Sequence, residues 1–269
     1  MNHSYPNIKQ SFGIFGIYLA ATFLMAMITM SAAHQPAFVF VNMLAINVIT
    51  IMVALKFKSA EMSFLFDGQK EFKWIYLPIL AIIDLAFILI MDPIISLVPM
   101  PEFLVKIFEE SIKINVWGYL SVGILAPVTE ELLFRKVMLP GLVKNYGVKK
   151  GIIWSAAFFA IFHMNPWQGV SAFLIGIFLA WVYLRTENIW LCIFLHWFNN
   201  TLGFLMLALS GDITFSLTNL FDNNLIMIGI MFLSAVCLYF CIKYLQSLLS
   251  TTPITTWNED PEETEQQQP

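Results

Sequence analysis

Long apolar stretches alternate with short polar segments along the whole chain. A helix of about 18–25 apolar residues can cross a bilayer, and on this basis the sequence predicts eight spans. The fifth and sixth are short and are joined by residues 164–169, where a proline ends one helix and a glycine loosens the turn. The pattern therefore predicts an all-α polytopic membrane protein. The predicted spans are 12–33, 37–56, 74–98, 115–136, 151–166, 168–185, 189–210 and 223–248.

Lysine and arginine positions predict how these spans are oriented. If the N-terminus lies inside, all of the 14 basic residues except Lys106 and Lys113 fall on inner segments. Cytoplasmic loops carry such an excess of basic residues, and adding or removing one span would destroy the bias. We therefore predict eight transmembrane helices with both termini inside.

The segments outside the spans are few. Residues 101–110 carry apolar side chains at helical spacing, which favours a short interfacial helix. The first apolar run exceeds the 7–15 residues of a signal-peptide core, so we interpret it as a retained span. Residues 1–250 are thus predicted to form one transmembrane domain, and the acidic, polar segment 251–269 a disordered cytosolic tail.

Composition agrees with this class. Hydrophobic residues make up 59% of the chain and charged residues only 12%, whereas soluble domains contain about 25% charged residues. The net charge of −4 comes mostly from the tail, so it says little about partners. No nucleic-acid partner is expected. The three cysteines lie in apolar runs without metal-ligand spacing, which is typical of small buried hydrophobic side chains.

Two adjacent acids, Glu130 and Glu131, directly follow the apolar run 116–128. A charged side chain in mid-membrane costs about 2.5–3.5 kcal/mol on insertion scales, so it is expected to be paired, to face a cavity or to be used. Glu131 and Arg135 have the i,i+4 spacing of an ion pair that would fix a helix end. The structural alternative is that the helix ends at Thr129 and that the acids cap a cytosolic helix.

Histidines and an asparagine also lie inside predicted spans. His163 falls in the fifth span, and His196 and Asn200 share one helix face of the seventh. Each could simply hydrogen-bond a neighbouring helix. Asp84 and Asp92, in or near the third span, are interpreted as structural.

Taken together, these groups suit hydrolytic chemistry. A glutamate and two histidines can activate a water molecule, directly or through a metal. An asparagine amide and an imidazole can donate hydrogen bonds to a developing oxyanion. Three successive polar-bearing helices, the fourth, fifth and seventh spans, supply them at compatible depths, namely through Glu130, His163 and the pair His196 and Asn200.

The same residues form three ordered motifs, Glu130-Glu131-x-x-x-Arg135, Phe159-x-x-x-His163 and His196-x-x-x-Asn200. This arrangement resembles the signature of the CPBP intramembrane proteases. That family groups CAAX prenyl endopeptidases of the Ras-converting type with bacterial bacteriocin-processing and self-immunity proteins. The motifs cover about 127–203, within a core at 115–210 that comprises the fourth to seventh spans.

The resemblance implies an α-helical membrane endopeptidase with its active site in that core. Glu130 would be the general base, and His163 would help to hold the attacking water. His196 and Asn200 would form the oxyanion hole. Supporting roles would fall to Glu131, Arg135 and Phe159.

The need for a metal is open at this point. The family is commonly labelled as metalloprotease, and Glu130, His163 and His196 could supply a His₂Glu ligand set for Zn²⁺ with an open fourth position. No H-E-x-x-H sequence is present. A glutamate-activated water without metal is equally consistent, and we favour this mechanism with no required cofactor.

The substrate is expected to be a peptide or a lipidated protein, prenylated or not, reached within membrane lipids. A chain this compact resembles a bacterial member, so we predict a multi-pass protein of the bacterial cytoplasmic membrane. One alternative is a non-catalytic self-immunity or binding protein with the same fold. A transporter is a further alternative, but the inverted repeats expected of one are not seen. The sequence does not indicate an oligomeric state.

Overall fold

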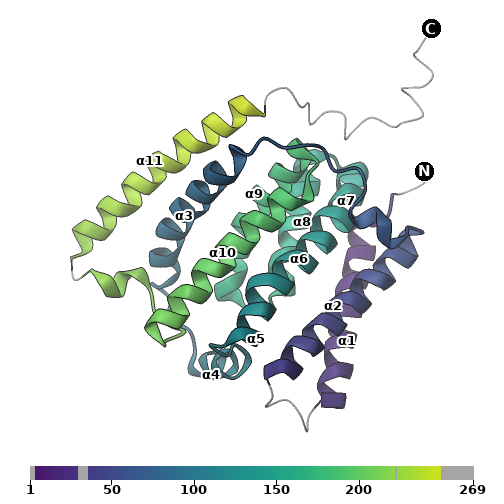
Figure 1. Cartoon of the computed structure of the whole chain (residues 1–269), viewed down its shortest axis with the longest axis horizontal. Coiled ribbons are helices and arrows are strands. Elements are labelled where there is room, and N and C mark those ends of the chain that lie inside the picture. The colour runs from purple at the N-terminus through teal and green to yellow at the C-terminus, as the bar shows by residue number, and fades with distance from the viewer. Residues whose placement is uncertain (1–3, 30–35, 222, 250–269) are drawn as a thin grey trace.

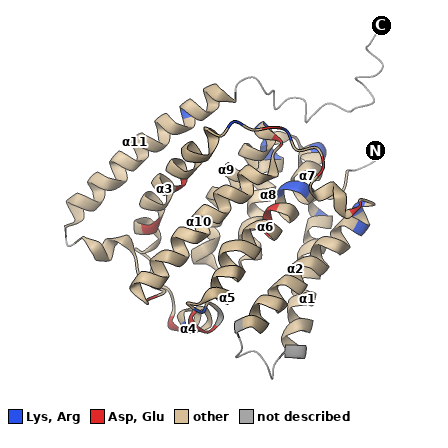
Figure 2. Cartoon of the chain, in the orientation of Figure 1, with Lys and Arg blue, Asp and Glu red and all other residues tan. Residues whose placement is uncertain are grey.

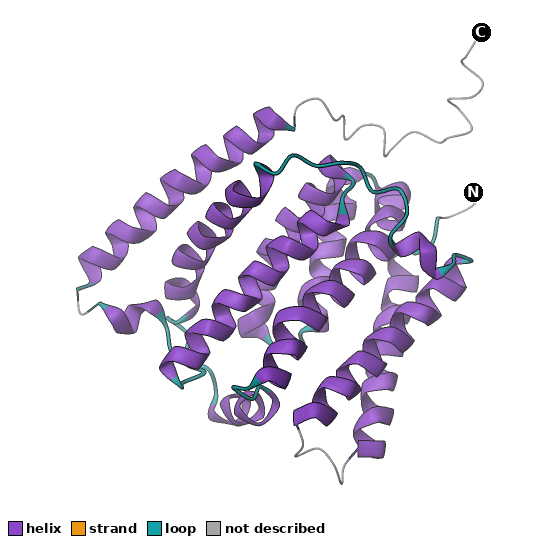
Figure 3. Cartoon of the chain, in the orientation of Figure 1, coloured by secondary structure: helices purple, strands orange, loops and turns teal. Residues whose placement is uncertain are grey.

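The computed structural model describes residues 4–29, 36–221 and 223–249. Regular structure in this described part is entirely helical, without a strand, as predicted (Figure 3). The predicted disordered tail, 251–269, lies outside the described residues. The helices are α1 (Ile8–Thr29), α2 (Pro36–Lys58), η1 (Met62–Leu65), α3 (Tyr76–Ile95), α4 (Glu102–Ser111), α5 (Val116–Tyr119), η2 (Leu120–Leu125), α6 (Ala126–Glu131), η3 (Leu132–Met138), α7 (Leu139–Tyr146), α8 (Val148–Phe162), α9 (Pro166–Thr186), α10 (Ile189–Ser210), η4 (Leu217–Leu220) and α11 (Asn224–Leu248).

Six helices of the described part are long and apolar enough to cross a membrane, namely α1, α2, α3, α9, α10 and α11. They correspond to the first three and last three predicted spans. The fourth predicted span is also helical but is divided into short α and π stretches, and the fifth corresponds to α8, which has 15 residues. The chain is therefore a multi-pass membrane protein, while the number of eight crossings stays a prediction. The short helix predicted at 101–110 is formed as α4, and its interfacial position stays a prediction.

The helices are arranged with the motif-bearing segments in the middle (Figure 1). Helices α3 and α11 lie together at one edge of the bundle, and α1 and α2 form a pair at the other. Between them lie α8, α9, α10 and the segment from α5 to α7. The central segment buries its side chains most completely: every residue from Glu131 to Leu139 is buried.

The central segment, α5 to α7, is a single helical path that adopts π winding in two places. Asn115 begins it by accepting hydrogen bonds from the backbone of Trp117 and Gly118. The π stretches η2 and η3 then flank the α-helical turn α6 that carries the two glutamates. Each π stretch is followed within two residues by a proline, Pro127 or Pro140. A proline removes one i→i−4 bond and crowds the preceding turn, which favours a locally wider helix.

This continuity corrects two expectations. The helix does not end at Thr129, because α6 and η3 continue through it, so Glu130 and Glu131 do not cap a cytosolic helix. It also extends beyond residue 136, the predicted end of the fourth span, to Tyr146. The ion pair of Glu131 and Arg135 therefore lies inside the helical path rather than at its end.

Candidate functional site

The centre of the candidate site is a buried cluster that joins α6 and η3 to α10. Glu131 Oε1 lies 2.9 Å from His196 Nδ1, and Glu131 Oε2 lies 3.1 Å from Arg135 Nε. Both side chains of the acid–arginine pair are 0% exposed. One carboxylate therefore connects the first sequence motif to the third.

Arg135 is held mainly by packing and charge rather than by directed hydrogen bonds. Its guanidinium carbon lies 4.6 Å from the centre of the Phe159 ring, a cation–π contact. Within the described part of the chain, neither terminal nitrogen of Arg135 has a hydrogen-bond partner, and its Nε–H is not directed at Glu131 Oε2. Phe159 thus packs against the buried cation, and its supporting role stays a prediction.

Phe159 also positions both histidines. Its ring contacts the rings of His163 and His196 edge to face, at centroid distances of 5.1 and 5.4 Å. His163 caps the C-terminus of α8, and its Nδ1 lies 2.8 Å from the Phe159 carbonyl oxygen. A carbonyl only accepts hydrogen bonds, so Nδ1 is the donor there. In the neutral ring this leaves Nε2 of His163 as an acceptor.

Two small cavities meet at His163. One, of about 110 Å³, is lined by His163, His196 and Asn200 among others, and brings the second and third motifs together. The other, of about 180 Å³, is lined by Glu130 and His163, with Tyr18 of α1 beside them. The four residues expected to be catalytic are therefore distributed over two adjoining cavities that share one imidazole.

The two asparagines of α10 have different partners. Asn200 Nδ2 donates to the backbone oxygen of Val122 in η2 at 2.9 Å. Asn199 Nδ2 donates to Asp84 Oδ1 in α3 at 2.9 Å. Asn199 also lines the same cavity as His163 and His196. Asp84 therefore reaches the edge of the site through Asn199.

The two intramembrane aspartates consequently differ. Asp84 is 0% exposed, and its Oδ2 has no partner among the described residues. Asp92 accepts hydrogen bonds from Ser216 Oγ and Leu217 N, both at 2.7 Å, and so fixes the start of η4. Asp92 has the expected structural role, whereas Asp84 was missed as a neighbour of the site. The sequence feature that indicates Asp84 as a candidate is its position as an acid inside an apolar span.

An aromatic network supports the same region of α10. Trp197 Nε1 donates to the hydroxyl of Tyr119 at 3.1 Å, and that hydroxyl lies 3.2 Å from Thr201 Oγ1. These contacts join α10 to α5. The sequence does not indicate these contacts, because an aromatic residue in a membrane helix carries no specific signal.

The structure does not gather the proposed metal ligands. Across residues 4–29, 36–221 and 223–249, no group of three or more His, Cys, Asp or Glu side chains has a metal-binding arrangement. His196 Nδ1 and His163 Nδ1 face a carboxylate and a carbonyl, respectively, which leaves Nε2 of each ring without such a contact. It is the separation of Glu130, His163 and His196, and not these contacts, that does not fit one shared ion.

Comparisons with known proteins point to the same core. Residues 112–202 match the family model described as "Type II CAAX prenyl endopeptidase Rce1-like". A curated relative, "Putative membrane peptidase YdiL" of Bacillus subtilis (strain 168), is 30% identical over 84 residues, which are 31% of this chain and 34% of the relative. The chain thus matches about a third of that relative's length. No solved structure matches.

The matched segment contains all three motifs and both π stretches. The two matches support assignment to the CPBP family and, more generally, a membrane protease. They leave open the catalytic type and the substrate.

Proposed function

We propose that the chain is an intramembrane endopeptidase of the CAAX-protease type that hydrolyses a peptide bond of a membrane-associated or prenylated peptide. One observation carries the proposal. The three motifs converge around His163, which shares one cavity with Glu130 and the adjoining one with His196 and Asn200. Ionisable groups inside a membrane helix bundle are costly, and those that face a cavity are candidates for a functional site by default.

The proposal includes eight crossings with both termini inside, in a bacterial cytoplasmic membrane. Six long helices support it, as does the helical path through α5–α7 with α8 beside it. The basic residues gather near one end of the bundle, around α7, the end of α2 and the segment before α3 (Figure 2). That end would be cytoplasmic by the positive-inside rule.

In the proposed reaction, Glu130 and His163 hold a water molecule between them. His163 donates through Nδ1 to Phe159, so Nε2 accepts one hydrogen of the water. The Glu130 carboxylate takes the other proton as the water oxygen attacks the carbonyl carbon. Collapse of the tetrahedral intermediate then breaks the C–N bond, and Glu130 returns the proton to the departing amine.

His196 and Asn200 act on the oxyanion. Glu131 accepts from Nδ1 of His196 and fixes the ring, so Nε2 of the imidazolium form can donate to the developing charge. Asn200 Nδ2 carries two hydrogens, of which Val122 engages one. The second is available to the oxyanion. Arg135 is a positioning residue that neutralises Glu131.

This mechanism requires no metal. Zn²⁺ bound by Glu130, His163 and His196 remains the alternative for the water-activation step, and it would need those side chains to rearrange. A chelator distinguishes the two mechanisms directly.

The test uses purified full-length protein in detergent with a quenched peptide library that contains prenylated and plain sequences. Wild type is compared with Glu130→Gln and His196→Ala, each with and without chelator. We expect cleavage by wild type alone, unchanged by the chelator. No cleavage of any peptide by a folded wild type would favour the non-catalytic binding protein, and loss of cleavage with chelator would establish the metal mechanism.

A further inference from the structure

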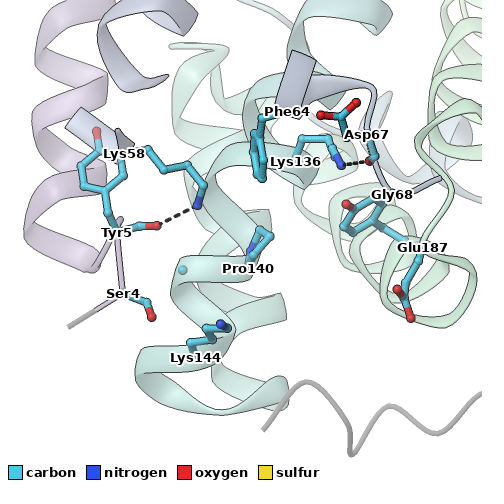
Figure 4. A pocket seen from close by; sticks show the side chains of 12 residues that line it. Ser4, Tyr5, Lys58, Phe64, Asp67, Gly68, Lys136, Pro140, Lys144 and Glu187 are labelled. Carbon is cyan, nitrogen blue, oxygen red and sulfur yellow. Dashed lines mark hydrogen bonds between the residues drawn. The ribbon is translucent and has the colours of Figure 1, made fainter. Parts of the chain in front are cut away.

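A larger cavity lies at the basic end of the bundle, apart from the motif residues. It has a volume of about 550 Å³ and is bounded by α2, η1, η3, α7 and the N-terminal segment (Figure 4). We call it the terminal pocket. None of Glu130, His163, His196 or Asn200 lines it.

Three lysines from three different elements line the terminal pocket. Lys58 and Lys136 lie on either side of one aromatic ring, with their Nζ atoms 5.1 and 5.0 Å from the centroid of Phe64 (Figure 4). Lys144, on α7, is exposed and also lines the pocket. Three ammonium groups are thus collected around one space.

The hydrogen bonds of these lysines leave their charge uncompensated. Lys58 donates to the Tyr5 carbonyl at 3.2 Å, and Lys136 donates to the Asp67 carbonyl at 2.8 Å. Both acceptors are neutral, and an ammonium group has three donors. Each of these two lysines can therefore still donate to an anion.

Two carboxylates also line the pocket, but they do not balance it. Glu187 is paired with Lys70, at 2.6 Å between Nζ and Oε1. Asp67 is the remaining acid; its side chain is exposed and its charge acts on Lys136, so one carboxylate faces three lysines. The pocket consequently carries an excess of positive charge.

Exposed aromatic side chains flank this end of the bundle. Phe57 stacks on Tyr5 with a centroid distance of 6.4 Å, and Phe66 stacks on Trp190 at 5.9 Å. Phe57, Phe66 and Trp190 are all exposed. Trp and Tyr, here Trp190 and Tyr5, are enriched at the membrane–water interface, which is the level of lipid head groups.

The N-terminal wall of the pocket is held in place. Asn145 Nδ2 donates to the Ser4 carbonyl, and the Ile8 amide donates to the Tyr146 hydroxyl. Gly141 permits this close approach, because a Cβ there would overlap the backbone of Tyr5 and Pro6. The pocket is therefore formed before any ligand enters.

We propose that the terminal pocket binds a phosphate-bearing anion through Lys58, Lys136 and Lys144. Two sources carry this chemistry, the head group of an anionic phospholipid and free inorganic phosphate. The site is independent of the proposed protease activity, so binding should be the same in the Glu130→Gln variant.

Native mass spectrometry of the full chain in detergent measures the affinity for phosphatidylglycerol and, as a zwitterionic comparison, phosphatidylcholine. Phosphatidylglycerol should bind more tightly. A lysine near a membrane surface is worth about 1 kcal/mol, so Lys144→Gln should weaken phosphatidylglycerol binding about fivefold. Lys144→Arg should retain it. Lys149→Gln is the matched control, because Lys149 is exposed near the same end but does not line the pocket.

A competition arm with saturating inorganic phosphate separates the two sources. Displacement of the lipid by phosphate makes both sources ligands of the site, and failure of phosphate to displace it restricts the site to the lipid head group. Equal binding of the two lipids would overturn the proposal. So would equal weakening by Lys144→Gln and Lys149→Gln, since this would indicate only a diffuse surface charge.

Discussion

Glu130 and Glu131 are neighbours in one turn of α6 and lie in opposite surroundings. Glu131 is fully buried, and His196 and Arg135 engage both of its oxygens. Glu130 is only partly buried and faces a cavity that it shares with His163. An acid inside a membrane bundle can thus be held in an ion pair, or it can face a cavity where it is able to react. A step of one residue along the helix is enough to change its surroundings from one to the other.

The first prediction concerns Glu130, the acid that faces the cavity. Glu130→Gln should lower the cleavage rate about 10²–10⁴-fold, the range for loss of a general base. Stability should hardly change, because the Glu130 carboxylate has no hydrogen-bond partner in the described part of the chain. Peptide cleavage and thermal unfolding in detergent would measure the two effects. Wild-type cleavage by this variant would contradict the assignment of the base.

The second prediction concerns Glu131, the acid that is paired with Arg135 and His196. Glu131→Gln leaves the buried Arg135 charge unpaired, and breaking a buried ion pair costs about 3–5 kcal/mol. Unlike Glu130→Gln, it should therefore strongly lower the stability measured by SDS-titration unfolding. The double variant Glu131→Gln/Arg135→Met should recover part of the loss. Equal stability of the two single Gln variants would refute the division of roles.

The third prediction tests the oxyanion side. Asn200→Ala should reduce kcat about 10²–10³-fold, as expected for one oxyanion donor, with little change in KM. Asn199→Ala on the neighbouring position is the control and should reduce kcat less. The opposite ranking of the two asparagines would show that the donor is wrongly assigned.

A fourth, smaller effect is expected from Asp84. Asp84→Ala leaves the Asn199 amide unpaired, at a cost of about 0.6–2 kcal/mol for an interhelical hydrogen bond. Because Asn199 lines the cavity of His196, kcat should also fall modestly. The exchanged pair Asp84→Asn/Asn199→Asp should restore both stability and kcat. A swap that restores only stability would limit Asp84 to a structural role.

The smallest effect is expected from Asp92→Ala. It removes two hydrogen bonds at the start of η4, and a lost cap costs about 0.5–2 kcal/mol. Cleavage should be unaffected at temperatures where the variant is folded. If kcat fell while the variant was fully folded, Asp92 would influence the candidate site, as we expect of Asp84, and would not be only structural.

The positions of the helices could be predicted from apolar runs, because a bilayer demands long stretches without charge. The winding of the central segment could not. A π turn and an α turn bury the same apolar residues, and only Pro127 and Pro140 distinguished these stretches in the sequence. The limits of α5–α7 therefore had to come from the structure.

The candidate site was predictable to the level of the helix face. Spacing at i,i+4 placed His196 with Asn200 and Glu131 with Arg135, and both pairs lie together. Which glutamate bonds His196 could not be predicted, since neighbouring side chains point about 100° apart on a helix and the rotation of α6 depends on η2. The contact of Asp84 with Asn199 depends on packing between α3 and α10, for which the sequence holds no pair signal.

The two π stretches also show where the chain can change its length without turning the site. A π turn holds one residue more than an α turn, so the extra residue is accommodated within the turn and the residues after it keep their direction. Deleting one residue within η2 should therefore convert it to an α turn and leave both glutamates facing their present surroundings. Deleting one residue of α6 ahead of Glu130, where the turn holds no extra residue, would instead turn both acids by about 100°. A homologue with an α turn in place of one π stretch would thus carry the same site with one residue fewer.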